Sequence, residues 1–193
     1  MHYQLTKKHQ LKTTNWEGGT TTQLAIFPSM AEYKQFNFYF RISYATVDVE
    51  ESTFTFMPGV NRHLMILNGT LQINHIDRYK KILNKFDIDT FNGEWPTTAK
   101  VTDFNIMTRG KANAELEVLI LKDTCSQKLL LNEKNNFTGI FVWNGSLQIN
   151  LPSENIQLYS GDFILFSYEK TKPILIKAPT YCELVVSQVK LKN

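Results

Sequence analysis

Residues 65–74 read MILNGTLQIN, and residues 141–150 read FVWNGSLQIN. Asn68 and Asn144 are 76 residues apart, and six of the ten positions are identical. Each stretch is an apolar run, an Asn-Gly dipeptide and then Leu-Gln-Ile, a pattern typical of a β-hairpin closed by a type I′ turn. Two unrelated hairpins would share this favoured turn but not the Leu-Gln-Ile-Asn that follows it. We therefore interpret the two stretches as an internal duplication, which predicts two similar β units.

The rest of the chain also consists of short runs that favour strands. Residues 38–45 read FYFRISYA and alternate at a period of two, so Arg41 and Ser43 share one face while Phe40 and Ile42 share the other. Turn signals recur about every 8–12 residues, and no helical period extends beyond two turns. These features predict an all-β sandwich or barrel. The duplication predicts two units, residues 1–110 and 111–193.

Composition excludes several classes of function. The chain has 193 residues with a net charge of +3 and no block of five like charges, which argues against nucleic-acid binding. No apolar run approaches the roughly 18 residues of a membrane helix, and the N-terminus has no apolar secretion signal. The two cysteines stand outside any metal-binding spacing and are expected to be free thiols. We expect a cytoplasmic protein.

The apolar strand, Leu67-x-Gly69-x-Leu71-x-Ile73 and a later Gly-Asp strand resemble the paired motifs of cupins, which are small double-sheet β-barrels. Two such barrels in one chain make a bicupin. In metal-binding cupins a glutamate ligand stands seven residues before the turn glycine, where this chain has Arg62 and, in the second copy, Thr138. The histidine positions of the first motif fall at Phe56 and Pro58, or one residue earlier. We therefore expect no metal and no other cofactor.

Four further motifs resemble the HutD/Ves family of bicupins. They are Asn15-Trp16-x-Gly18-Gly19-x-Thr21-x-Gln23, Phe40-Arg41-Ile42-Ser43-x-Ala45, Phe54-x-Phe56-x-Pro58-Gly59-x-x-Arg62 and Asp103-Phe104-Asn105-x-Met107. They run in family order through residues 14–110, whereas residues 111–193 match only in general style. The resemblance implies a regulatory protein that senses a metabolite in histidine utilisation, or a stress-associated one. It brings no catalytic residues.

Arg62 is the first candidate for ligand binding, because the position of a metal ligand in cupins points into the barrel. A buried guanidinium keeps its charge and needs a partner. That partner is either a ligand carboxylate, clamped by two hydrogen bonds, or an internal acid such as Glu51 or Asp103. Arg41 with Ser43 forms the second candidate, with a surface or interdomain salt bridge as its alternative.

Asp103 and Asn105 alternate onto one face and would supply an acceptor and a donor to an amide-bearing ligand, or satisfy loop backbone instead. Trp16, Thr20 and Thr21 are expected to line the pocket, although a tryptophan is more often a packing residue. His63 follows Arg62 and should therefore point to the opposite face. His75 is a still weaker candidate for acid–base chemistry.

The leading hypothesis is a metal-free bicupin that binds a small anionic metabolite, a carboxylate such as a formylated or acylated amino acid. The rival is a metal-independent enzyme of isomerase, epimerase or hydrolase type, for which Tyr39 or Tyr44 would have to serve as the base. Pairing of sheet edges would give a homodimer.

Overall fold

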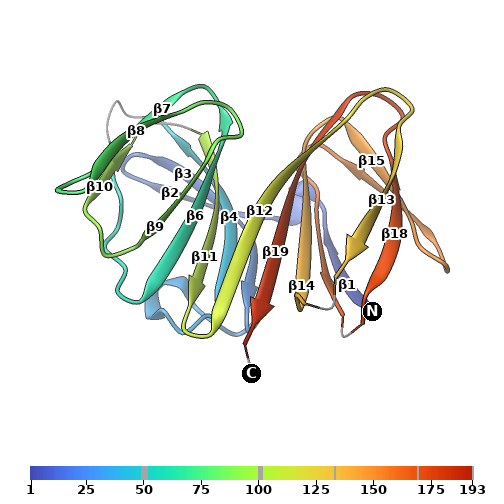
Figure 1. Ribbon diagram of the computed structural model, residues 1–193, viewed down its shortest axis with the longest axis horizontal. Helices are drawn as coiled ribbons and strands as arrows, with labels where there is room; N and C mark the ends of the chain where they lie inside the picture. The colour runs from blue at the N-terminus through green and yellow to red at the C-terminus, as the bar shows by residue number, and fades with distance from the viewer. Residues whose placement is uncertain (49–51, 100–101, 133, 169, 193) are drawn as a thin grey trace. The chain divides into compact units, whose positions relative to one another are not determined.

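The computed structural model describes residues 1–48, 52–99, 102–132, 134–168 and 170–192, and the regular secondary structure in these ranges is nearly all β-strand (Figure 1). Within them the only helices are the single 3-10 turns η1 (Lys8–Gln10) and η2 (Tyr33–Gln35). The strands divide between two compact units. We call residues 12–114, with Lys192, the first barrel, and residues 1–11 and 115–191 the second barrel. The all-β prediction is confirmed.

The first barrel is built from two sheets. Its strands are β2 (Lys12–Trp16), β3 (Gly19–Phe27), β4 (Phe40–Val47), β5 (Ser52–Thr53), β6 (Val60–Asn68), β7 (Leu71–His75), β8 (Tyr79–Leu83), β9 (Ile88–Asn92), β10 (Thr97–Ala99) and β11 (Thr102–Arg109). One sheet has the order β2-β3-β4-β11-β6-β9, and the other has the order β5-β10-β7-β8. All the strand pairs with a described register are antiparallel.

The second barrel repeats this plan. Its strands are β1 (His2–Thr6), β12 (Ala112–Leu121), β13 (Ser126–Leu131), β14 (Phe137–Asn144), β15 (Ser146–Asn150), β16 (Asn155–Tyr159), β17 (Phe163–Ser167), β18 (Lys172–Lys177) and β19 (Cys182–Leu191). The sheet orders are β1-β17-β14-β19-β12 and β13-β18-β15-β16. The order β4-β11-β6-β9 in the first barrel corresponds to β12-β19-β14-β17 in the second, and β5-β10-β7-β8 corresponds to β13-β18-β15-β16. The two barrels therefore have the same strand order, as the duplication predicts.

The repeated stretch is not a hairpin, and this prediction was wrong. β6 pairs with β9 and β11 in one sheet, whereas β7 pairs with β8 and β10 in the other. The Asn68-Gly69 dipeptide thus carries the chain from one sheet to the other. In the second barrel, Asn144-Gly145 does the same between β14 and β15. Gly69 and Gly145 have φ of 80° and 87°, but neither asparagine has a positive φ. A type I′ turn needs positive φ at both central residues, so this turn is of a different type.

The N-terminal residues lie in the second barrel, not in the first as the 1–110 division implies. β1 pairs with β17 over five residues. The carboxylate of Asp162 fixes the turn that follows, since its oxygens accept hydrogen bonds from Lys8 N at 2.9 Å and Lys7 Nζ at 3.0 Å. The later division also falls inside β12, between Ala114 and Glu115.

The core of the first barrel lies between its two sheets. Leu64 and Ile66 of β6 pack there with Leu71 and Ile73 of β7 and with Phe91 of β9. Each such side chain contributes about 1.5–3 kcal/mol when it is fully buried. The face of β6 that carries Leu64 and Ile66 is therefore the interior face.

Among the described residues there is no helix with the length and apolar character needed to span a bilayer.

Candidate functional site

The candidate site lies on the interior face of three neighbouring strands in the first barrel, β4, β11 and β6 (Figure 1). Met107 of β11 stands opposite Arg41 on one side and Arg62 on the other. Residues opposite one another in a sheet share a face, and Arg62 precedes the core residue Leu64 by two positions. Both arginines therefore start from the interior face, in one row across the sheet.

The next rows of the same face carry the other polar residues of the site. Asn105 stands opposite Ser43 and Leu64, and Asp103 stands opposite Ala45 and Ile66. The register thus brings together Arg41, Ser43, Arg62, Asp103 and Asn105. All five are buried, with exposed fractions between 2% and 7%. Such a concentration of buried polar groups is unusual, since charged residues are almost never fully buried unless they are paired.

Arg62 is held by neutral groups. Its Nη2 donates to Thr55 O at 2.7 Å, and its guanidinium carbon lies 5.1 Å from the centroid of the Phe54 ring. Its Nε is buried and has no hydrogen-bond partner among the described residues. Burial lowers the pKa of Arg62, against the opposing effects of Tyr33 and Asp103. The group nevertheless stays charged at neutral pH, because an arginine starts from a very high pKa.

The partners of Arg41 among the described residues are also neutral. Its Nε donates to Gln23 Oε1 at 2.9 Å, and its Nη1 donates to Ser43 Oγ at 3.2 Å. The Tyr33 ring lies against it, with the guanidinium carbon 4.3 Å from the ring centroid. Burial lowers the pKa of Arg41, and the charge of Arg62 lowers it further, so the two cations repel one another.

Neither arginine forms a salt bridge within the described ranges. Of the two internal acids that the sequence offered as partners for Arg62, Asp103 lies beyond salt-bridge distance and Glu51 lies outside the described residues. In the described part of the chain, the site therefore holds two buried positive charges with one carboxyl group, that of Asp103, near them.

The carboxyl group of Asp103 offsets the positive charge of the two arginines only in part. Burial raises its pKa to about 7, although Arg62 acts in the opposite direction, so near neutral pH the carboxyl is partly protonated. Its Oδ1 accepts a hydrogen bond from Asn105 Nδ2. The Oδ1 of Asn105 is buried and has no hydrogen-bond partner in the described part of the chain. The site thus offers an unused donor on Arg62 and an unused acceptor on Asn105.

The remaining predicted pocket residues are divided by strand alternation. Thr21 stands opposite Ala45 and shares the face of the site, whereas Thr20 stands opposite Thr46 and points to the other face. Trp16 is 39% exposed and packs its indole over Gly18, where an added Cβ would lie 2.2 Å from the ring. Thr20 thus has no direct place in the site, and Trp16 lies on β2, two strands from β4.

The residues considered for acid–base chemistry lie elsewhere. Tyr44 stands opposite Phe104, on the face away from Arg41, and Tyr39 precedes β4 and is 48% exposed. His63 stands opposite Ile106 on that same outer face, as alternation predicted, and its Nδ1 lies 3.3 Å from Thr90 Oγ1. None of these side chains reaches the two arginines.

Sequence reasoning missed two partners of Arg41. Gln23 stands opposite Ser43 and shares the face of Thr21 by ordinary alternation, before a β-bulge shifts the pairing between Gln23 and Ala25. Tyr33 comes from η2, and its hydroxyl lies 3.8 Å from Met57 Sδ. Gln23 was within the quoted family motif, so its position was available as a signal, whereas nothing local in the sequence marks Tyr33.

A second buried polar cluster in the first barrel surrounds His75, which the sequence marked only as a weak candidate for acid–base chemistry. His75 Nε2 lies 2.8 Å from Asp89 Oδ2, and its Nδ1 lies 2.7 Å from Thr97 Oγ1. The Tyr79 hydroxyl donates to Asp89, and burial with this neighbouring charge raises the pKa of Tyr79 to about 12. The alternation of side chains along a strand would have predicted a buried His75, because His75 shares the face of Leu71 and Ile73.

The described residues do not contain three histidine, cysteine, aspartate or glutamate side chains grouped as a metal site would require. The donors that do converge, two guanidinium groups and an amide, are cationic or neutral. Such a set suits an anion better than a metal ion.

Each of the two units is a barrel in which two antiparallel sheets enclose the interior. Two such barrels in one chain define a cupin-type protein. A model of the HutD family matches residues 8–184, and the chain belongs to that family. A comparison with curated proteins found no match.

Solved structures share the fold over their whole length. The conserved protein of unknown function PA5104 from Pseudomonas aeruginosa PAO1 is 16% identical, with a TM-score of 0.85 over 98% of this chain and 100% of that one. HutD from Pseudomonas fluorescens SBW25, in a formate condition, is 13% identical with a TM-score of 0.74 and full coverage of both chains. Bacterial pirin YhhW from Escherichia coli, in complex with nickel(II), is 11% identical with a TM-score of 0.70, covering 97% and 98%.

Proposed function

We propose that the first barrel binds a small carboxylate between Arg41 and Arg62. The observation that carries the proposal is the burial of two guanidinium groups that have no acidic partner among the described residues. A buried charge without a counterion is costly, and a ligand carboxylate supplies that counterion with charge-assisted hydrogen bonds. The free Nε of Arg62 is the donor still available for it.

The duplicated barrel acts as an internal control for this interpretation. By strand register, Arg62, Asp103 and Asn105 correspond to Thr138, Leu184 and Val186 of the second barrel. The same topology thus forms with uncharged and mostly apolar side chains at these positions, so folding does not require the charges. We infer that the first barrel retains them for binding.

The Asp103–Asn105 pair indicates that the ligand carries a further polar group besides its carboxylate. The unused Oδ1 of Asn105 would accept a hydrogen bond from an amide N–H, and a protonated Asp103 would donate to a carbonyl. A formylated or acylated amino acid carries a carboxylate and an amide together. Binding such a metabolite without turnover fits a regulatory role in histidine utilisation, and the relative from P. fluorescens was crystallised in a formate condition.

A metal-independent enzyme is the second candidate, and one observation favours it. A carboxyl group whose pKa lies near 7 is poised to act as a general acid or base, and Asp103 has this property beside a guanidinium. Turnover of N-formylglutamate or N-acetylglutamate that is lost in Asp103→Asn would favour an enzyme over a sensor.

Thermal unfolding in the presence of N-formylglutamate, N-acetylglutamate and formate tests the binding proposal. A ligand at one hundred times its Kd stabilises the folded state by about 2.7 kcal/mol, or roughly 5–10 °C for a chain of this length. Arg62→Ala should weaken binding about a hundredfold, because it removes a buried charge-assisted contact.

Arg78→Ala is the matched control, since Arg78 belongs to the same barrel but is exposed, with its guanidinium 4.1 Å from the centroid of the Trp95 ring. It should respond to the carboxylates as the parent does. Equal responses of Arg62→Ala and the parent would refute the proposal, as would an equal response to the uncharged amide of the same acid.

A further inference from the structure

The second barrel has its own cavity, and one residue that lines it, Tyr168, contacts the counterpart of Arg62. Thr138 takes the place of Arg62 on β14, opposite Gln188 of β19 and Phe166 of β17. Its hydroxyl lies 2.6 Å from the hydroxyl of Tyr168, and both residues are buried. Two neutral hydroxyls thus replace the guanidinium at this level of the barrel.

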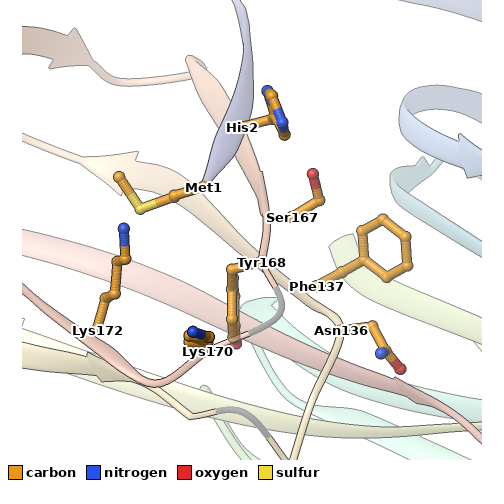
Figure 2. A pocket seen from close by; sticks show the side chains of 8 residues that line it. All are labelled: Met1, His2, Asn136, Phe137, Ser167, Tyr168, Lys170 and Lys172. Carbon is orange, nitrogen blue, oxygen red and sulfur yellow. The ribbon is translucent and has the colours of Figure 1, made fainter.

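A cavity of about 420 Å³ opens beside Tyr168. Asn136 and Phe137 line it from the start of β14, and Ser167 lines it from the end of β17, with the first two residues of the chain at the rim. Lys170 and Lys172 lie on one side of Tyr168, and Asn136 and Phe137 lie on the other (Figure 2). The volume is within the range of small-molecule sites.

The described lining carries the positive charges of Lys170 and Lys172, and Glu169, between Tyr168 and Lys170, lies outside the described residues. Neither Lys170 nor Lys172 forms a salt bridge with any residue in the described ranges, and both side chains are exposed. One hydroxyl of the Thr138–Tyr168 pair donates to the other, so if Thr138 is the donor the Tyr168 proton is free for a ligand. Burial raises the pKa of Tyr168, which keeps this proton in place at neutral pH.

We propose that this cavity is a second anion site, built on lysines and a tyrosine hydroxyl instead of buried arginines. Its ligand class is a small organic dianion, a dicarboxylate or a phosphate monoester, whose negative charges reach the lysines while its body contacts Phe137. The lysine charges are exposed, so binding should be weaker and less selective than in the first barrel. The two barrels would then bind different anions independently.

Titration of the ¹⁵N-labelled full-length protein with succinate and with phenyl phosphate tests this site residue by residue. Saturable shifts are expected at the backbone amides of Ser167 and Tyr168, with Kd in the millimolar range. Lys172→Gln should raise that Kd about fivefold, the usual value of an exposed ion pair. Lys177→Gln is the matched control, because Lys177 is exposed at the opposite end of the same strand.

Arg62→Ala separates this site from the first barrel and should leave the Ser167 and Tyr168 shifts unchanged. The two probes distinguish a preference for carboxylate from one for phosphate. Shifts that do not saturate, that succinamide reproduces, or that Lys177→Gln reduces as much as Lys172→Gln does would overturn the proposal. If the parent protein shows these shifts but no carboxylate response that depends on Arg62, only the function proposed for the first barrel is refuted.

Discussion

The titration of Asp103 makes stability depend on pH in a direction that can be worked out. Burial raises its pKa from 3.8 to about 7 in the folded state. Between these values the folded chain binds more protons than the unfolded chain, so the free energy of unfolding falls as pH rises and levels off above about 7. Each pKa unit corresponds to about 1.4 kcal/mol, so the ionised carboxyl costs roughly 4 kcal/mol in full.

Asp103→Asn removes the charge and keeps an oxygen that accepts the hydrogen bond from Asn105. From about pH 5 to about pH 8, the parent should lose roughly 2–3 kcal/mol of stability relative to this variant. Urea unfolding followed by tryptophan fluorescence measures the difference at each pH. A Trp143→Phe background confines the signal to the first barrel, because the other tryptophans, Trp16 and Trp95, lie there.

Asp77→Asn is the control, since Asp77 is exposed in the turn between β7 and β8, and its conformation with positive φ suits asparagine equally well. This variant should show the same pH dependence as the parent. A stability difference between Asp103→Asn and the parent that does not change with pH would refute the burial of an ionisable carboxyl at this position. A change of opposite sign would mean that Asp103 is ionised and paired in the folded state.

Two further predictions concern the duplicated fold. Gly145→Ala should cost about 1–3 kcal/mol in urea unfolding, because φ is 87° and the new Cβ would lie 2.3 Å from Tyr181 O. Gly110→Ala has a positive φ but nothing within 4 Å, so it should cost only the backbone strain of about 1 kcal/mol. The triple variant Arg62→Thr, Asp103→Leu and Asn105→Val gives the first barrel the side chains of the second. It should be as stable as the parent or more stable by about 1–4 kcal/mol, and show no thermal shift with carboxylates.

Local periodicity was sufficient to predict the β architecture and the faces of the site strands. Alternation places Arg41 with Ser43, and Asp103 with Asn105, whatever the neighbouring strands are. It could not predict that Met107 lies between Arg41 and Arg62, because the order β4-β11-β6 joins strands far apart in the chain. That order, which no local pattern encodes, creates the site.

The failed predictions have physical reasons of the same kind. An Asn-Gly dipeptide between apolar runs indicates a tight turn, but the pattern does not say whether the second strand stays in the sheet or crosses to the opposite one. The assignment of residues 1–11 failed similarly, since an edge strand of five residues carries no mark of the sheet it joins. Thr20 was misplaced because one position along a strand reverses the face.

The comparison of the two barrels extends beyond the arginines. Asp89 stands opposite Leu64, and its counterpart Ile164 stands opposite Ile140, so a buried carboxylate in one barrel is an apolar side chain in the other. His75, which binds that carboxylate, corresponds to Leu151 by the offset of the repeat. Buried polar groups rarely add stability over well-packed apolar ones. Among the described residues, the first barrel therefore carries two costly polar clusters at positions that are uncharged and mostly apolar in its duplicate, as we would expect if the first barrel binds a ligand as proposed.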